Sequence, residues 1–395
     1  MVNKTRGGML RESPHMHRRR RGGLWPLLVA AGLSASCGYL FRAHGAVNSG
    51  RAGTARSGRP PAAAPSLPTR PIPRISEMTN AVAINARGDI LVWILKHPRI
   101  KAPLVLLTSS GIRVIRAPGF FLNGKALNNA DQVVGSAVRT RPKSELLGTR
   151  AFALSGGRFR LLRQPPGQDW SEATAINDRG DVVGDCLFPT RLSDNFPAVL
   201  WTNGHVKRLP SLYGLLDVAY GINDHREIVG SCTNSNGRPT PVFWDRKGVH
   251  ALRTLGGGSG EAEAVNDSGR IVGYSTIATG QTHACLWESG RVVDLLGNRS
   301  RYSEAAAISP DGTVAGFFLD GKHFRAFTWS KGRVSLLPRP DDSSAKAEGV
   351  NDAGDVVGDV RIKTPQVVTI YAVVWRKGQM RRIRLEGLSN VGEKR

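Results

Sequence analysis

The stretch Ala262-Glu263-Ala264-Val265-Asn266-Asp267-Ser268-Gly269-Arg270-Ile271-Val272-Gly273 decides the fold, because variants of it recur along the chain. The core of the phrase is a small residue, any residue, a second small residue, an aliphatic residue and an Asn. Seven copies end at Asn85, Asn128, Asn177, Asn223, Asn266, Ser309 and Asn351. Their spacing of 42 to 49 residues predicts an array of similar units rather than two or three independent domains.

Each repeat is expected to form four short strands, as residues 262–296 illustrate. Residues 262–265 alternate small and larger side chains, and residues 270–274 are rich in β-formers. A third strand is expected at 283–287 and a fourth at 291–296, with no helical periodicity anywhere in the repeat. The array is therefore predicted to be all-β.

The Asn of the phrase predicts a tight turn after the first strand. An Asn side chain can bond backbone two residues on, and a residue three positions later can take positive φ. This pattern favours a type I turn with a Gly bulge. The residue three positions after the Asn position, where the bulge is expected, is Gly in five copies and Asp131 or Arg226 in the other two. A second Gly lies seven residues after the Asn in six copies, and Val92 replaces it in the first.

Small residues in the first strand carry the main clue to architecture. The second and fourth residues before the Asn position are Ala or Gly in all seven copies. Because strand side chains alternate, these two are expected to share a face where other backbone comes close, as on the inner wall of a radial array. The third strand ends in Trp201, Trp244, Trp287, Trp329 or Trp375, which are expected to be wedges between sheets.

Four-stranded units at this period predict a seven-bladed β-propeller over residues 75–388. The repeats start near residues 79, 122, 171, 217, 260, 303 and 345. A β-solenoid is the main rival, but its repeats are normally shorter. The ring would close either by packing the first blade on the seventh or by a crossover of the tail.

The repeat resembles that of the bacterial HAF-repeat family, which is named for a His-Ala-Phe triplet before Leu-Trp. The segment His283-Ala284-Cys285-Leu286-Trp287 carries the resemblance, and Arg325-Ala326-Phe327-Thr328-Trp329 is a second near match. The likeness covers residues 79–385, although no copy has the literal triplet. It implies an extracellular repeat protein and brings no activity that can be assigned to a residue.

The N-terminal region differs from the array. The first 75 residues hold thirteen Lys or Arg and one acidic residue, Glu12, so they carry +12 of the total charge of +24. A basic segment, residues 1–23, precedes an apolar segment, residues 24–41, and this order predicts an export signal or a membrane anchor. Residues 42–74 are rich in Pro, Ala and Arg and are expected to be a disordered linker. The alternative is a mispredicted start with a basic leader.

The sequence contains no recognisable catalytic set, phosphate loop, metal-ligand spacing or cofactor motif. Cys186, Cys232 and Cys285 form no CxxC pair, and we expect three small half-buried thiols. A disulfide between Cys186 and Cys232, which hold equivalent places in adjacent repeats, is the less favoured alternative.

One candidate binding site emerges from the repeat alignment. Glu172, Glu261 and Glu304 each lie five residues before the repeat Asn position, and Lys346, Asn80 and Asn123 hold that place in other copies. If the first strand lines a channel, the three carboxylates lie near one mouth and could bind a cation, an amine or a polar sugar. Trp170 and Tyr302 lie close by in the sequence and could stack on a sugar. The alternative is that the carboxylates only hydrate the mouth or bond the preceding loop.

These observations favour an exported scaffold that binds a surface glycan or a protein and has no defined activity. The first alternative is a secreted hydrolase or lyase acting on glycans, an argument by fold analogy. The second is a basic protein that binds nucleic acid through residues 1–75, which the export-like leader makes the weaker hypothesis.

Overall fold

Twenty-eight strands run through the residues that the computed structural model describes, 74–96, 104–139, 148–189 and 196–385. These residues belong to one unit, Asn48–Arg395, and the other unit is Met1–Val47. The predicted basic segment, apolar segment and all of the linker except Arg74 lie outside the described residues. The expected all-β architecture is confirmed, and the strands follow the repeats in consecutive groups of four.

Five of these groups are separate antiparallel four-stranded sheets. The second and third repeats form β5 (Phe120–Leu127), β6 (Val133–Arg139), β7 (Thr149–Ser155), β8 (Arg158–Leu161), β9 (Gln168–Ile176), β10 (Val182–Pro189), β11 (Ala198–Thr202) and β12 (His205–Arg208). The fourth and fifth form β13 (Leu216–Ile222), β14 (Ile228–Thr233), β15 (Pro239–Asp245), β16 (Gly248–Ala251), β17 (Gly256–Val265), β18 (Ile271–Ile277), β19 (Thr282–Glu288) and β20 (Arg291–Asp294). After the 3-10 turn η1 (Gly297–Arg299), the sixth forms β21 (Ser303–Ile308), β22 (Val314–Asp320), β23 (His323–Ser330) and β24 (Arg333–Leu336).

The first and last repeats share a single eight-stranded sheet. The first contributes β1 (Arg74–Ile84), β2 (Ile90–Lys96), β3 (Leu104–Thr108) and β4 (Gly111–Ile115), and the last contributes β25 (Ser343–Val350), β26 (Val356–Lys363), β27 (Val367–Arg376) and β28 (Gln379–Arg382). The two halves join where β1 pairs with β27 in parallel, from Arg74↔Val367 to Met78↔Ile370. The Thr79 hydroxyl also accepts a 3.0 Å hydrogen bond from the backbone amide of Ala372.

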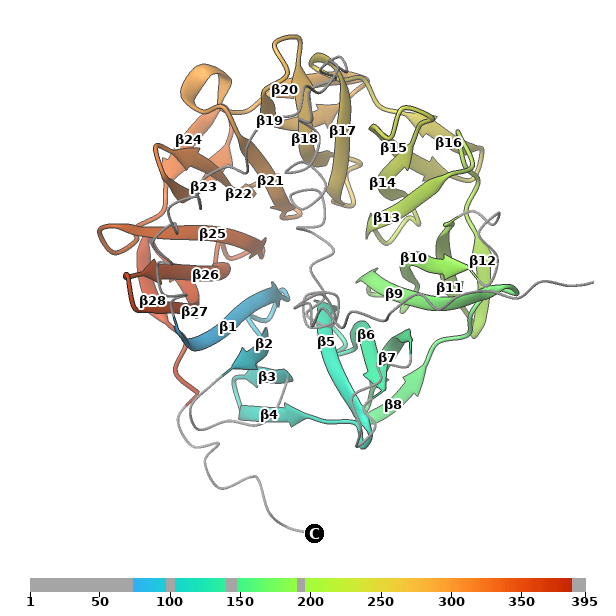
Figure 1. Ribbon diagram of the computed structural model, residues 1–395, viewed down its shortest axis with the longest axis horizontal. Coiled ribbons are helices and arrows are strands. Elements are labelled where there is room, and N and C mark those ends of the chain that lie inside the picture. The colour runs from blue at the N-terminus through green and yellow to red at the C-terminus, as the bar shows by residue number, and fades with distance from the viewer. Residues whose placement is uncertain (1–73, 97–103, 140–147, 190–195, 386–395) are drawn as a thin grey trace, which may run out of the picture. The chain divides into compact units, whose positions relative to one another are not determined.

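The sheets lie around a common centre, with the first strand of each repeat innermost (Figure 1). Each first strand contacts the first strand of the next repeat, from β1 to β5 and onward to β25, which contacts β1 again. All of the repeat turns line one hollow of about 360 Å³, which marks one mouth of the central channel. The contact between the first and last repeats makes the array a closed ring rather than a linear solenoid, which is the β-propeller arrangement.

The repeat Asn residues link each turn to the next one. The Asn128 side-chain amide donates a 2.9 Å hydrogen bond to the backbone carbonyl of Asn177, and equivalent bonds of 3.0 to 3.4 Å start at four other Asn residues. Asn351 completes the circle with a 3.2 Å bond to the carbonyl of Asn85. Ser309 has no amide to donate, and its hydroxyl contacts Thr313 within its own turn. Six of the seven positions therefore support a ring of hydrogen bonds around the channel mouth.

The two small positions of the first strand lie on opposite faces, contrary to the alternation expected from the sequence. In the third repeat, Ala173 packs among residues of the second repeat, whereas Ala175 packs among residues of the fourth. The cause is a β-bulge between these positions, visible as a register shift against β10, and the same shift recurs in every first strand. An extra residue in one strand reverses the face on which later side chains lie. Both neighbouring sheets can therefore approach closely.

In the six repeats that carry the second Gly, the bulged strand crowds that position, whereas the first repeat has Val92 there. A Cβ on Gly184 would lie 1.9 Å from the backbone oxygen of Glu172, and one on Gly135 would lie 2.0 Å from that of Asn123. Such a contact cannot be relieved by side-chain rotation, because the clashing atom is backbone. Only Gly fits there unless the strand moves.

Four of the five tryptophans expected to be wedges are buried between sheets, and Trp329 is half-buried against the cluster between the fifth and sixth repeats. Trp201, Trp244, Trp287 and Trp375 are each 5% exposed or less. Each donates its indole N–H to a backbone carbonyl 34 to 38 residues earlier, at 2.6 to 2.8 Å. Each ring therefore fills apolar space and also fastens its third strand to the loop that ends the preceding repeat.

Candidate functional site

Two positions of each first strand carry most of its charged side chains, and these positions are the candidate lining of the central channel. The first is five residues before the repeat Asn position and holds Asn80, Asn123, Glu172, Val218, Glu261, Glu304 and Lys346. The second is three residues before it and holds Val82, Lys125, Thr174, Tyr220, Glu263, Ala306 and Glu348. We call these positions the outer ring and the inner ring, the inner ring being closer to the repeat turns. Most of these side chains are half-buried, so solvent reaches them along the wall.

Acidic groups outnumber basic ones on this wall. The two rings and the strand positions paired with the outer ring hold seven carboxylates: Glu172, Asp185, Glu261, Glu263, Glu304, Glu348 and Asp359. They hold two lysines, Lys125 and Lys346. The excess is notable because the whole chain carries +24. A cleft lined by one sign of charge concentrates counter-ions of the other sign.

The Glu172 carboxylate is buried and interacts with other side chains of the protein rather than facing solvent. It is 6% exposed, lies 3.2 Å from the ammonium of Lys125, and accepts a 3.3 Å hydrogen bond from the Ser136 hydroxyl. Its cross-strand neighbour Asp185 is 3% exposed. Burial, followed by the charge of Glu172 and opposed by Lys125, raises the pKa of Asp185 to about 8.

Glu304 lies beside an aromatic cluster. It accepts a 2.8 Å hydrogen bond from the Tyr302 hydroxyl. The Tyr302 ring neighbours Phe317 and Phe324, with centroids 6.4 and 6.2 Å away. The ammonium of Lys346 lies 4.0 Å from the Phe317 centroid and 4.7 Å from that of Phe324. Aromatic faces attract cations, so this cluster holds Lys346 in place.

Two further carboxylates, Glu263 and Glu348, interact electrostatically with Glu304. Burial and the charges of Glu304, Glu261 and Glu348 raise the pKa of Glu263 well above its usual value. Burial raises the pKa of Glu348 to about 7, with Lys346 opposing the shift and Asp359 adding to it. The pKa of Asp359 rises to about 6, mainly because the group is buried. Like charges held together favour protonation or a bound cation.

The structure thus groups the predicted site residues unevenly. Glu261, Glu304 and Tyr302 share one acidic sector of the wall, whereas Glu172 pairs with Lys125 in another. Trp170 lies on β9 opposite Leu187. Glu263, Glu348 and Lys125 were missed from the sequence, because the inner-ring position is the variable residue of the repeat phrase. The sequence pattern that could have revealed them is a charged residue at that position in three copies.

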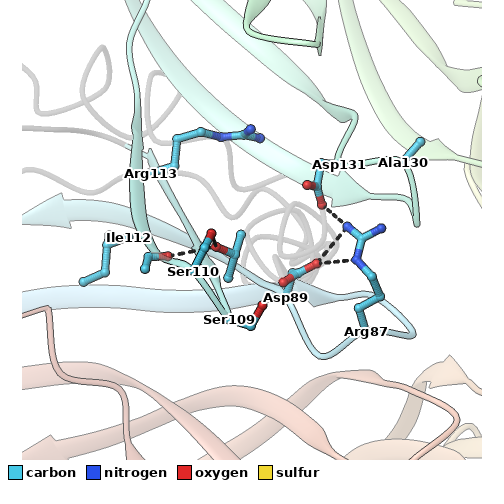
Figure 2. A pocket seen from close by; sticks show the side chains of 10 residues that line it. Arg87, Asp89, Ser109, Ser110, Ile112, Arg113, Ala130 and Asp131 are labelled. Atoms are coloured by element: carbon cyan, nitrogen blue, oxygen red, sulfur yellow. Dashed lines mark hydrogen bonds and ion pairs between the residues drawn. The ribbon is translucent and has the colours of Figure 1, made fainter.

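A polar pocket of about 410 Å³ lies away from the channel, beside the turns of the first two repeats. Figure 2 shows Arg87 directed at Asp89 and Asp131, and it pairs with both carboxylates. The Thr108 and Ser110 hydroxyls bond each other at 2.8 Å. An anion entering here would meet the carboxylates Asp89 and Asp131 as well as Arg87 and Arg113, so the channel is the stronger candidate.

Among the described residues, no three His, Cys, Asp or Glu side chains are arranged to hold a metal ion. Cys186, Cys232 and Cys285 are free thiols that are fully buried rather than half-buried. Burial raises the pKa of Cys186 and Cys232 to about 12 each. Within the described ranges, no helix is both long and apolar enough for a membrane span.

Comparisons with known proteins identify the class of fold. The sequence matches no family model and no curated protein. The β-propeller domain of the Trilobed protease from Pyrococcus furiosus, described as having an open velcro topology, superposes with a TM-score of 0.55 at 10% identity, over 80% of this chain and 99% of that one. The Pyrococcus horikoshii acylaminoacyl peptidase gives 0.54 at 13% identity, over 80% of this chain and 55% of that one. The chain is a β-propeller, and at these identities the likeness concerns the fold alone.

Proposed function

We propose that this protein is an exported seven-bladed β-propeller that binds a cationic small molecule in its central channel. The observation that carries the proposal is the cluster of Glu263, Glu304 and Glu348 on the inner wall of a chain that is otherwise strongly basic. A carboxylate cluster in a narrow site of low dielectric favours an ammonium or guanidinium guest.

The count of seven blades rests on the eight-stranded sheet being two blades joined side by side. The parallel contact of β1 with β27 has counterparts elsewhere, as isolated bridges Phe196↔Leu216 and Thr282↔Tyr302 between adjacent repeats. The same junction is therefore present between ordinary blades and is merely longer at the closure. Together with the seven repeat turns around one mouth, this supports seven equivalent blades.

Export is proposed from the basic segment 1–23 followed by the apolar segment 24–41. The likeness of the repeats to the HAF-repeat family agrees with an extracellular location. Fractionation of cells expressing the full chain, with sequencing of the mature N-terminus, tests this part. Recovery of the uncleaved chain solely in the soluble intracellular fraction would contradict it.

Binding is tested by calorimetry on the purified full chain with putrescine, a linear diamine, and with 1,4-butanediol, its uncharged counterpart. We expect saturable binding of putrescine at low salt and none of the diol. The double variant Glu263→Gln/Glu348→Gln should weaken putrescine at least tenfold, because it removes two carboxyl groups that can ionise against the bound cation.

A matched control is Asp341→Asn/Asp342→Asn, which removes the same formal charge from exposed positions. It should leave putrescine affinity within about twofold, since exposed charges are screened by salt. Equal weakening by both double variants would mean that only the net charge matters, and the proposed site would be wrong.

A glycan hydrolase is the second candidate, favoured by one observation. Glu348 has a pKa of about 7, as a general acid at neutral pH requires, and it lies near Glu304 and Asp359. Hydrolysis of aryl glycosides that is lost in Glu348→Gln would support this candidate. Full retention of turnover in that variant would exclude Glu348 as the acid.

A further inference from the structure

The carboxylates that follow the repeat turns pair with arginines in all repeats but one. The residue four places after the repeat Asn position is acidic in four repeats, where it is Asp89, Asp181, Glu227 or Asp355. Three of these carboxylates form ion pairs, which are Asp89 with Arg87 at 2.9 Å, Asp181 with Arg226 at 2.6 Å and Asp355 with Arg376 at 2.8 Å. Among the residues that the structure describes, Glu227 forms no ion pair, and its carboxylate accepts a 2.7 Å hydrogen bond from the Asn223 amide.

Glu227 cannot take a partner from the usual place in its own repeat. In three other repeats, the side chain at this position bonds the residue that directly follows the third-strand Trp, as Arg270 bonds Glu288 at 2.6 Å. In the fourth repeat that residue is Asp245, a second acid, which bonds His250 at 2.9 Å instead. The fourth repeat therefore has two acids where the others have complementary groups.

The missing arginine has a defined place at the contact between adjacent repeats. Arg226 belongs to the fourth repeat and reaches back to Asp181 of the third. The sheets of the fourth and fifth repeats are likewise adjacent (Figure 1), but Gly269 holds in the fifth repeat the position that Arg226 holds in the fourth. A Cβ on Gly269 would lie 3.6 Å from the Glu227 Oε2. Glu227 thus stands toward the next repeat as Asp181 does, without the guanidinium.

A pocket of about 540 Å³ occupies this place. Glu227 and Gly269 line it together with the half-buried apolar side chains of Phe243, Leu252 and Val265. These three pack at the margin of the hydrophobic cluster between the fourth and fifth repeats. The pocket therefore combines a carboxylate that lacks a counter-ion with apolar surface that is open to a ligand.

The other charged groups of the pocket do not replace the arginine. Glu288 is already paired with Arg270 at 2.6 Å. Arg253 and Arg291 are exposed, and neither forms an ion pair with Glu227 within the described ranges. A half-buried carboxylate beside apolar surface attracts a cation more strongly than an exposed one does, because the local dielectric is lower.

We propose that this pocket binds an arginine side chain of a partner polypeptide, with the guanidinium on Glu227 and the aliphatic stem against Phe243 and Leu252. Arginine is expected rather than lysine because each paired carboxylate of this set is paired with a guanidinium, whose planar fork matches a carboxylate. The methylene groups of the stem can cover apolar surface. The pocket shares no lining residue with the outer and inner rings of the channel, so this site is independent of the proposed cation site.

The test is calorimetry at low salt on the full chain with three peptides, acetyl-Gly-Arg-Gly-amide and its lysine and citrulline counterparts. Citrulline has the shape of arginine without the charge. We expect saturable binding of the arginine peptide and binding at least about tenfold weaker for the other two, because only the guanidinium is both charged and forked. An arginine peptide that binds no more tightly than the lysine or citrulline peptide would overturn the inference.

Two variants locate the site. Glu227→Gln removes the charge at the same size and should weaken the arginine peptide roughly tenfold or more. Gly269→Arg supplies the missing arginine from the chain itself and should abolish binding. The backbone accepts this change, because Arg226 has a φ of 63° at the equivalent position and Gly269 has a φ of 75°. Asp341→Asn, at an exposed position, is the matched charge control and should leave the affinity within about twofold.

The remaining outcomes separate this pocket from the channel. Unchanged affinity in Glu227→Gln, or no binding of the arginine peptide, would show that the inference is wrong. If Glu263→Gln/Glu348→Gln weakens the arginine peptide as much as Glu227→Gln does, the peptide binds in the channel and the inference also fails, while the proposed function stands. Binding of the arginine peptide that depends on Glu227, without binding of putrescine, would support this site and refute the channel proposal.

Discussion

The side-chain amide of Asn351 donates a hydrogen bond to the backbone carbonyl of Asn85 across 266 residues of sequence. This bond joins the last repeat to the first in the same way that each Asn joins its own repeat to the next. Closure of the ring is therefore built from the repeat motif itself, and the parallel pairing of β1 with β27 reinforces it. The channel exists because the ring closes.

Replacing Asn351 should loosen this closure. Asn351→Ala removes the bond to Asn85 and the bond that its Oδ1 accepts from the Asp355 amide at 2.9 Å. We expect a loss of about 1–3 kcal/mol in the free energy of unfolding, measured by urea denaturation. Ser309→Asn is the reciprocal change, since it supplies the missing amide, and it should be neutral or stabilising. A loss from Ser309→Asn as large as that from Asn351→Ala would contradict the proposed linkage.

The crowded Gly positions predict a second effect. Gly184→Ala places a methyl group 1.9 Å from the Glu172 backbone oxygen, so the strand must move. The expected cost is about 1–3 kcal/mol, from overpacking of a close-packed interior. Gly349→Ala is a matched comparison, since its Cβ would meet the Val357 side chain at 3.1 Å and should be accommodated more cheaply. Thermal unfolding of both variants measures the difference, and a similar loss from each would show that the backbone clash is not decisive.

Two hairpin turns predict gains in stability. Lys331 and Lys377 have φ of 48° each, a left-handed conformation that favours Gly or Asn, and both precede a Gly. Asn203 takes the same place in the third repeat with a φ of 49°. Lys331→Asn and Lys377→Asn should therefore each stabilise the protein by about 0.5 kcal/mol. Chemical denaturation tests this, and a loss of stability in both variants would refute the conformational argument.

Stability should fall as pH rises from about 4 to about 8. The pKa of Asp185 in the folded protein is about 8, above its ordinary value, so the folded state binds more protons than the unfolded state across this window. The free energy of unfolding therefore falls as pH rises, because stability rises with pH only where the unfolded state binds more protons. Glu348 and Asp359, with pKa values of about 7 and 6, act in the same direction.

The variant Asp185→Asn isolates this contribution. It removes a titrating group next to Glu172 and Lys125, so the slope of stability against pH should become shallower between pH 5 and pH 8. The free energy of unfolding from urea titrations at several pH values provides the measurement. An unchanged slope in Asp185→Asn would show that the Asp185 carboxyl is not protonated in the folded state.

The buried cysteines should resist modification. Cys186, Cys232 and Cys285 are fully buried, and burial raises the pKa of each thiol, so little reactive thiolate is present. In a Cys37→Ser background, a thiol reagent should label none of them in the native state and all three in denaturant. Only one labelled thiol after denaturation without reductant would indicate a disulfide between two of them.

The sequence predicted the strands and their grouping, because the repeat phrase combines a turn signal with a β-rich run. It did not predict the bulge that separates Ala173 from Ala175, since an extra residue shows only against the partner strand. Gly184 was the available signal, as it marks the point where backbone approaches backbone. The parallel pairing of β1 with β27 depends on ring closure and has no local sequence pattern.

The candidate site was predicted in part for a related reason. Glu261 and Glu304 share a repeat position and were found by alignment of the copies. Glu263 and Glu348 hold the variable position of the same phrase. The alternation of strand side chains gave no reason to expect a functional side chain at that position. Glu172 followed the pattern but pairs with Lys125, a partner from the preceding repeat that spacing along one strand cannot reveal.

The most direct test is a crystal structure of the protein grown with putrescine at neutral pH. We expect seven four-stranded blades, closed between β27 and β1, with the amine in the channel against Glu263 and Glu348. A ring of another blade number, or a saturated complex with the amine bound outside the channel, would contradict this proposal.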